Sequence, residues 1–169
     1  MLVRRGELRD AENLSALAIQ VWLHTYATEG ISSVVSRYVL SEFSAGKFEV
    51  ALSEDSTAVL VAEVNESLVG YAKLTTGKLC PVATSSEVEL ATLYVQEHFV
   101  GTGVGRALLG QAEQWARHRT NSSIWLAVNS KNSRAIAFYA KHGYTKLGIT
   151  HFELGNEKHE NLVLGGRDA

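Results

Sequence analysis

One short glycine-rich loop limits the fold and the chemistry of this chain more than any other feature. Residues 98–109 have the sequence HFVGTGVGRALL, with Gly101, Gly103 and Gly105 at alternate positions directly before an apolar helical pattern. Glycine has no Cβ atom, so this loop reaches backbone conformations that other residues resist and allows a ligand close to the main chain. The pattern predicts a strand-to-helix turn that binds phosphate, although a tight turn without a ligand also favours glycine.

Two common phosphate-binding motifs do not fit this spacing. The dinucleotide pattern G-x-G-x-x-G fails, because counting from Gly101 places Arg106 at the third glycine and counting from Gly103 places Leu108 there. A Walker loop, G-x-x-x-x-G-K-[ST], is also absent from the sequence. What remains is a set of main-chain N–H groups from Gly101 to Arg106 at a helix N-terminus, where the helix dipole favours an anion such as a pyrophosphate.

Composition and charge exclude several classes of partner. The chain has 169 residues, a net charge of -2 and a pI near 6.3, without the basic excess of a nucleic-acid-binding protein. The single cysteine, Cys80, excludes an intramolecular disulfide and fits the reducing cytoplasm. The segment MLVRRGELRDAENL is not typical of a signal peptide, and no stretch reaches the roughly 18 apolar residues of a membrane span. We expect one soluble, cytoplasmic domain over residues 1–169.

The apolar pattern predicts an alternation of strands and helices. Stretches rich in strand formers predict strands at 2–5, 57–64, 68–75, 87–95, 123–128, 144–154 and 160–165. Helical spacing predicts four helices: one capped by Asp10, one after Gly30, one after the glycine loop and one over 132–143. The strands at 57–64 and 68–75 form a predicted hairpin. This order indicates an α/β (α+β) fold, in which helices cover a mixed sheet.

The glycine loop and its flanks resemble a known family. The stretch LYVQEHFVGTGVGRALL is similar to the acetyl-CoA loop of the GNAT superfamily of N-acetyltransferases, whose pattern is [QR]-x-x-G-x-[GA] after a strand. Gly103 and Gly105 occupy its two small-residue positions, whereas Val100 replaces the usual Gln or Arg. This difference removes one polar side chain near the phosphates and leaves the backbone donors in place.

Two further stretches extend the resemblance. In LAVNSKNSRAIAFYAKHGYTKLG, the second half of the family pattern is matched by Asn132, Ala135, Phe138, Tyr139, Gly143 and Tyr144. The stretch THFELGNEKHENLVL is similar to the end of the PaiA-like branch, which is associated with spermine and spermidine. The resemblance implies a GNAT fold: a mixed, mostly antiparallel sheet of about six to seven strands, about four flanking helices and an acetyl-CoA cleft between the two central parallel strands.

The expected reaction transfers acetyl from acetyl-CoA to a primary amine by direct attack in a ternary complex, with a polyamine favoured. An alkyl amine is neutral only to about one part in 10³ at pH 7, so a base must remove its proton. Glu89 lies eleven residues before Val100, where the resemblance implies a general base; a solvated strand-edge carboxylate is the alternative. Glu87 lies two residues earlier on the same face of the expected strand and is the second candidate.

The resemblance also implies roles for other residues. The N–H group of Leu93, at a strand bulge, is expected to bind the oxyanion, and Tyr139 to protonate the leaving thiolate. Tyr139 also suits the apolar face of its helix, and Asn132 also suits a helix N-cap. Thr25, Tyr26 and Glu87 are the candidates for binding the acceptor. The residues expected to contact acetyl-CoA are Leu93, Tyr94, Val95, Val100, Gly101, Thr102, Gly103, Val104, Gly105, Arg106, Asn132, Tyr139 and Lys141.

Two other functions fit the same residues. One is a CoA-binding sensor or scaffold without catalysis, which Val100 favours, and the other is an N-acetyltransferase of proteins or peptides. Cys80 has no evident His or acid partner for an acyl-enzyme mechanism. His151 and His159 lack a third ligand, so no metal site is expected. The terminal strands offer an edge for a possible homodimer, and no membrane or nucleic-acid partner is expected.

Overall fold

The computed structural model describes residues 1–82 and 86–166, and its backbone forms two compact units. The first unit holds Met1–Leu74 and Thr92–Ala112, and the second holds Thr75–Ala91 and the described residues from Glu113 onward. Strands β3 and β4 and helix α4 each have residues in both units. Their bounds are Ser67–Thr76, Val88–Val95 and Val104–Thr120. The single domain predicted over residues 1–169 stays a prediction.

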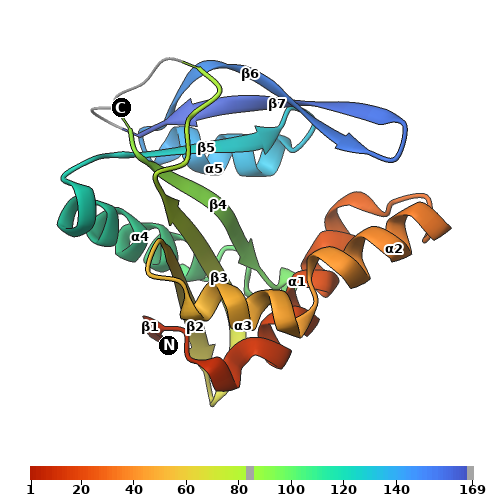
Figure 1. The fold of residues 1–169 in the computed structure, drawn as a ribbon, viewed down its shortest axis with the longest axis horizontal. Helices are drawn as coiled ribbons and strands as arrows, with labels where there is room; N and C mark the ends of the chain where they lie inside the picture. The colour runs from red at the N-terminus through yellow and green to blue at the C-terminus, as the bar shows by residue number, and fades with distance from the viewer. Residues whose placement is uncertain (83–85, 167–169) are drawn as a thin grey trace. The chain divides into compact units, whose positions relative to one another are not determined.

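The first unit begins with a strand and three helices (Figure 1). Strand β1 (Leu2–Arg5) pairs antiparallel with β2 (Thr57–Val64). A turn at Asn65 and Glu66, whose φ angles are 49° and 63°, leads from β2 into β3 and confirms the predicted hairpin. The helices between β1 and β2 are α1 (Ala11–Tyr26), α2 (Ser33–Glu42) and α3 (Ala45–Ser53). The 3₁₀ turn η1 (Leu8–Asp10) precedes α1, and the 3₁₀ turn η2 (Glu97–Phe99) follows β4.

The core of the first unit includes the contacts of α3 with α1 and with β2. The apolar residues at helical spacing in α1 are buried, namely Leu14, Leu17, Ala18 and Trp22, apart from the half-buried Val21. The sequence pattern misses α3, because its single buried residue, Phe48, gives no helical period. Side chains that are fully buried in this unit include Leu14, Val59, Val61, Val69, Tyr71, Leu74, Val104, Leu108 and Leu109.

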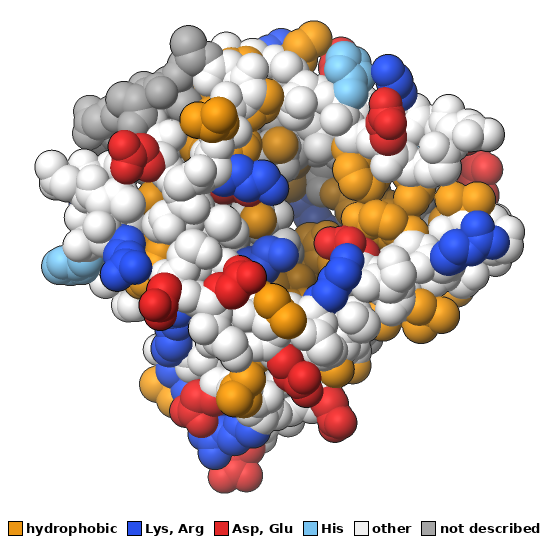
Figure 2. Space-filling view, in the orientation of Figure 1, with side chains coloured by type: hydrophobic (Ala, Val, Ile, Leu, Met, Phe, Trp, Pro, Cys, Tyr) orange, Lys and Arg blue, Asp and Glu red, His pale blue; other side chains and the backbone are white. Residues whose placement is uncertain are grey.

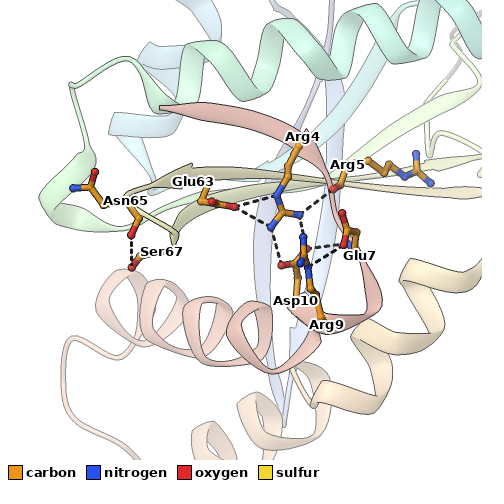
Figure 3. A network of polar contacts seen from close by, with 8 residues as sticks. All are labelled: Arg4, Arg5, Glu7, Arg9, Asp10, Glu63, Asn65 and Ser67. Atoms are coloured by element: carbon orange, nitrogen blue, oxygen red, sulfur yellow. Dashed lines mark hydrogen bonds and ion pairs between the residues drawn. The ribbon is translucent and has the colours of Figure 1, made fainter.

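Arg4 and Asp10 join β1 to the start of α1 through buried ionic contacts (Figure 3). The guanidinium of Arg4 donates to both carboxylate oxygens of Asp10, at 2.7 and 2.9 Å, and to Glu63 of β2 at 3.0 Å. Asp10 also accepts from the N–H group of Glu7 at 2.8 Å. Asp10 is the N-cap residue of α1, as predicted, but its side chain makes no capping bond to that helix and instead accepts from Arg4 and Glu7.

Replacing Asp10 by Asn is expected to lower the free energy of unfolding by about 2 kcal/mol at pH 7, because Arg4 loses a buried ionic hydrogen-bond partner. The hydrogen bonds from Arg4 hold the pKa of Asp10 below its usual value. That stabilisation is present above the unfolded pKa of about 3.9 and is lost as pH falls through the folded pKa. The difference between the two proteins should therefore shrink at pH 3 in urea denaturation. Glu12→Gln, at an exposed residue of α1, is the control and should leave stability nearly unchanged.

The second unit is built around the C-terminal strands (Figure 1). Strand β4 pairs in parallel with β5 (Ile124–Asn129), through Val88↔Ile124 and Glu89↔Trp125. Strand β5 then pairs antiparallel with β7 (Glu157–Gly165), and β7 pairs antiparallel with β6 (Thr145–Leu154). Helix α5 (Ser133–Lys141) connects β5 to β6. In the β6–β7 register His151 lies opposite Glu160 and His159 lies opposite Phe152, so the two histidines do not pair.

The strand order of the sheet is β1-β2-β3-β4-β5-β7-β6, with the parallel pair β4–β5 at its centre. This order confirms the mixed α/β (α+β) sheet that the sequence predicts. Acidic and basic side chains are interspersed on the face that Figure 2 shows, in agreement with the small net charge. Within residues 1–82 and 86–166, no helix has both the length and the apolar character needed to cross a membrane.

Candidate active site

The glycine loop of the first unit turns from η2 into α4 through two left-handed residues. Gly101 and Gly103 have φ angles of 81° and 96°, a region that favours glycine, as predicted. Gly105 differs, because it already lies in α4. The turn is held by N–H bonds from Val100 to the carbonyl of Glu97 at 3.1 Å and from Thr102 to the carbonyl of Phe99 at 3.3 Å.

The N-terminus of α4 presents main-chain donors beside open space. The first i→i−4 bond of the helix runs from the N–H group of Ala107 to the carbonyl of Gly103 at 3.0 Å. The N–H groups of Val104, Gly105 and Arg106 precede that bond and have no partner within the helix. Apart from Gly103 itself and its two chain neighbours, no atom of the described chain lies within 4 Å of where a Cβ atom of Gly103 would stand. These donors and this space fit a diphosphate group.

One side chain near these donors is buried, and three, which we call the exposed rim, face solvent: Val100, Thr102 and Arg106. Val104 is fully buried and fixes the first turn of α4 in the core, whereas Arg106 is exposed. Val100 is 39% exposed, and Thr102 donates its hydroxyl to the carbonyl of Phe99 at 2.7 Å. The side chain of Val100 is therefore apolar and the hydroxyl of Thr102 is engaged, whereas Arg106 is an exposed cation.

Gly70 of β3 sets how closely β3, β4 and α4 approach one another in the first unit. A Cβ atom on Gly70 would stand 2.8 Å from the carbonyl oxygen of Tyr94 and 3.2 Å from side-chain atoms of Val104 and Leu108. The N–H group that follows β4, at Gln96, donates to the carbonyl of Val69 at 2.9 Å. The sequence analysis missed Gly70, because an isolated glycine in a strand signals a close approach without saying what approaches.

The expected cofactor residues of β4, Leu93, Tyr94 and Val95, are half-buried in the first unit. The ring of Tyr94 packs edge-on against Tyr71, with ring centroids 5.6 Å apart, and against Phe43 at 6.3 Å. These contacts fix the strand from which the N–H group of Leu93 is expected to act. The bulge predicted at Leu93 stays a prediction.

The two expected acceptor residues of α1, Thr25 and Tyr26, lie in its last turn. The hydroxyl of Thr25 donates to the carbonyl of Val21 at 2.8 Å. Tyr26 is 40% exposed, and its ring lies 5.2 Å from that of Trp22. Trp22 in turn contacts Tyr38 of α2 at 5.0 Å. Burial, with the nearby charge of Glu42, raises the pKa of Tyr38 to about 12.

Glu89 of the second unit has a largely buried carboxylate. Its side chain is 14% exposed, on the face of β4 opposite the fully buried Val88 and Leu90. Its Oε2 atom lies 3.4 Å from Nζ of Lys78, and it has no hydrogen-bond partner within the described residues. Trp125, its register partner in β5, likewise has a buried Nε1 atom without a partner in that part of the chain. Glu89 is thus a shielded carboxylate in contact with one alkyl ammonium.

Glu87 differs from Glu89 in position and exposure. It precedes β4 and is exposed, and its predicted position on the same face as Glu89 stays a prediction. Its main-chain groups bond elsewhere: its N–H group donates to the hydroxyl of Ser122 at 3.1 Å, and its carbonyl accepts from Gly77 at 3.0 Å. Strand β4 therefore begins at Val88, one residue later than predicted.

The remaining expected residues of the second unit belong to α5. Tyr139 is 7% exposed, and its ring lies 5.6 Å from that of Tyr144 and 5.3 Å from that of Phe138. Asn132 caps the helix, since its side-chain oxygen accepts from the N–H group of Ala135 at 3.1 Å. Lys141 is exposed in the last turn. The cap occupies the oxygen of Asn132 and leaves its NH₂ group as a donor.

The structure thus gathers the predicted residues into two sets. The first unit holds the glycine loop and the end of β4, and the second holds Glu89, Glu87 and the residues of α5. Lys78, which contacts Glu89, was missed by the sequence analysis, because no periodicity relates a loop residue to a strand eleven positions away. Cys80 is half-exposed in the same loop.

The chain is similar to several known proteins. Residues 19–144 match the model of the acetyltransferase (GNAT) family. An uncharacterized N-acetyltransferase of Mycobacterium tuberculosis is 33% identical over 158 residues, which cover 91% of this chain and 94% of that protein. A spermidine N(1)-acetyltransferase of Thermoplasma acidophilum is 24% identical over 84% of this chain and 86% of its own length. The crystal structure of the PaiA N-acetyltransferase from Thermoplasma acidophilum, in complex with coenzyme A, has a TM-score of 0.78 at 20% identity, covering 98% and 97% of the two chains.

Proposed function

Because the chain belongs to the GNAT family of acetyl-CoA-dependent N-acetyltransferases, we propose that it acetylates a primary amine of a small molecule, with a polyamine favoured. The amine attacks the thioester directly in a ternary complex. Glu89 acts as general base, the N–H group of Leu93 stabilises the oxyanion, and Tyr139 is the general acid for the leaving thiolate.

The observation that carries this proposal is the contact between Glu89 and an amine of the chain itself. The ammonium group of Lys78 lies 3.4 Å from a carboxylate oxygen that has no other partner within the described residues. A primary amine substrate offers the same chemical group. A largely buried carboxylate that contacts an alkyl ammonium is suited to remove a proton from that ammonium. The product is a neutral, nucleophilic amine.

The glycine loop supports the assignment of the cosubstrate. Donors at the N-terminus of α4 and open space beside Gly103 suit the diphosphate of acetyl-CoA. We expect the half-buried segment from Leu93 to Val95 to pair through its main chain with the extended arm of the same molecule. Val100 supplies no polar group at the position where the family pattern has Gln or Arg, so the backbone donors carry more of the binding.

The preference for a polyamine rests on relatives and on charge. One relative is named a spermidine acetyltransferase, and a structural neighbour is named PaiA. A polyamine carries more than one ammonium, so it needs a second anionic or aromatic contact besides Glu89. In the first unit Glu42 lies near Tyr38, in the same aromatic cluster as Tyr26 of α1. The lone Cys80 fits the cytoplasm, where we place the reaction, and the possible homodimer stays a prediction.

An acceptor screen tests the proposal. The purified chain is incubated with acetyl-CoA and, in separate reactions, with spermidine, spermine, an amino acid, an amino sugar and a peptide with a free N-terminus, and release of free thiol is measured. The polyamines are expected to give kcat/KM values at least about tenfold above the others, a difference of 1.4 kcal/mol in transition-state binding. If the peptide is the fastest acceptor, the substrate is a protein or peptide and the polyamine preference is wrong. If no amine causes thiol release, the proposed acetyltransferase activity is contradicted.

A further inference from the structure

We propose that Lys78 is an internal acetyl acceptor, which the enzyme modifies on its own chain through Glu89. The inference rests on the proposed role of Glu89 as general base. It follows from the position of Nζ of Lys78, 3.4 Å from Oε2 of Glu89, in the second unit. That nitrogen stands where a substrate amine must stand to give up its proton to this carboxylate.

The backbone directs Lys78 toward β4. Strand β3 ends at Thr76, and Gly77 follows with a φ angle of 73°, in the left-handed region that reverses the chain. The N–H group of Gly77 donates to the carbonyl of Glu87 at 3.0 Å, which ties the start of the loop to the start of β4. Lys78 is the next residue, so its place beside Glu89 is set by the main chain as well as by its own flexible side chain.

A second contact holds the described part of the same loop farther along. A side-chain atom of Val82 lies 2.6 Å from where a Cβ atom of Gly148 would stand, so Val82 packs directly over the backbone of β6. The loop is therefore fixed at Gly77 and at Val82, four residues after Lys78.

The two partners differ in a way that suits transfer. Lys78 is 61% exposed, whereas Glu89 is 14% exposed. The ammonium is open to solvent and to an entering acetyl donor, while the carboxylate is shielded. The contact is an ion pair without hydrogen-bond geometry, since Oε2 of Glu89 has no hydrogen-bond partner in the described part of the chain. A loosely held ammonium can leave for a free substrate amine or lose its proton and react.

The chemical step balances with acetyl-CoA as the only co-reactant. The ammonium of Lys78 loses one proton to Glu89 and from there to solvent. Its nitrogen forms a bond to the acetyl carbonyl carbon, the carbon–sulfur bond breaks, and the thiolate takes up the second proton. The product is a neutral amide at residue 78, so the positive charge beside Glu89 disappears and with it the competitor for a substrate ammonium.

The same unit offers a matched lysine. Nζ of Lys158 lies 3.4 Å from Oε1 of Glu153, the same distance as in the Lys78 pair. Both partners of this second pair are exposed, at 70% and 67%, on the β6–β7 hairpin. Proximity to a carboxylate is therefore equal at the two lysines, and only Lys78 faces the proposed base.

The test incubates the full chain with acetyl-CoA and no acceptor, and follows acetylation at residues 78 and 158 over time by peptide mass spectrometry. We expect Lys78 to react at least about tenfold faster than Lys158, with a rate constant independent of protein concentration, as for a reaction within one molecule. Glu89→Gln should reduce the rate at Lys78 to that at Lys158, and Glu153→Gln should change neither. In heat-unfolded protein the two lysines should react equally.

Equal rates at the two lysines in the folded protein, or an unchanged rate at Lys78 in Glu89→Gln, would overturn the inference. Thiol release with spermidine, measured on the same preparations and on Lys78→Arg, separates this failure from failure of the proposed function. Turnover of spermidine without acetylation of Lys78 leaves the proposed function standing and removes the internal acceptor. Acetylation of Lys78 without turnover of any free amine supports the internal acceptor and contradicts the proposed function.

Discussion

Glu89→Gln is expected to lower kcat for amine acetylation about 10²-fold, because the variant keeps the shape of the side chain and loses the base. The bound amine must then lose its proton to water, so the residual turnover should rise with pH toward the amine pKa of about 10.4. Turnover is measured by thiol release between pH 6 and pH 10. Binding of CoA, followed by thermal stabilisation, should remain close to that of the parent protein.

Two further substitutions make this result specific to Glu89. Glu153→Gln removes an exposed carboxylate that holds a lysine at the same 3.4 Å distance, and should leave kcat within about twofold of the parent. Glu87→Gln tests the second candidate of the sequence analysis. If Glu87→Gln loses the activity and Glu89→Gln keeps it, the base has been assigned to the wrong carboxylate.

Gly103→Asp is expected to weaken binding of acetyl-CoA more than any other single change in the glycine loop. The residue has a φ angle of 96°, immediately before the N–H groups of α4 that have no partner within the helix. An aspartate there adds a negative charge beside the expected diphosphate and competes for the same donors. Titration calorimetry with CoA is expected to show a loss of affinity of at least about 10²-fold, or 2.8 kcal/mol.

Gly103→Asn is the matched control for this charge. Asparagine and aspartate have nearly the same shape and a similar tolerance of positive φ, so strain and steric effects are shared. The asparagine variant should bind CoA at least about tenfold more tightly than the aspartate variant. Equal affinities in the two variants would mean that no anion lies at the N-terminus of α4.

Much of the fold could be predicted because its signals are local. The predicted strand at 57–64 has the bounds of β2, since a run of strand formers there ends at a two-residue turn. The helix after the glycine loop has the expected buried face, with Leu108, Leu109 and Ala112 in the core. Helix α3 was missed because one buried aromatic residue carries its packing, and this gives no period to detect.

The candidate site could be predicted in its parts but not in its contacts. Positive φ at Gly101 and Gly103 follows from glycine itself, whereas the start of β4 before Glu89 adjoins main-chain bonds of Glu87 with Ser122 and Gly77, which join distant segments. The pairing of Glu89 with Lys78 depends on the chain reversal at Gly77, which precedes Lys78. Asp10 is a second contact that the sequence does not predict. Its residue type is favoured at helix caps, but its carboxylate accepts hydrogen bonds from Arg4 instead of capping α1.

The close approach at Gly70 also restricts how this enzyme can change. Every missense mutation of a glycine codon adds a Cβ atom, and at residue 70 that atom would stand 2.8 Å from the carbonyl oxygen of Tyr94. Substitution of Gly70 is therefore not a route by which the packing of β3 against β4 and α4 can change in small steps. Variants with altered donor preference are expected to arise in the exposed rim, at residues such as Val100 and Arg106, where side chains are free to vary.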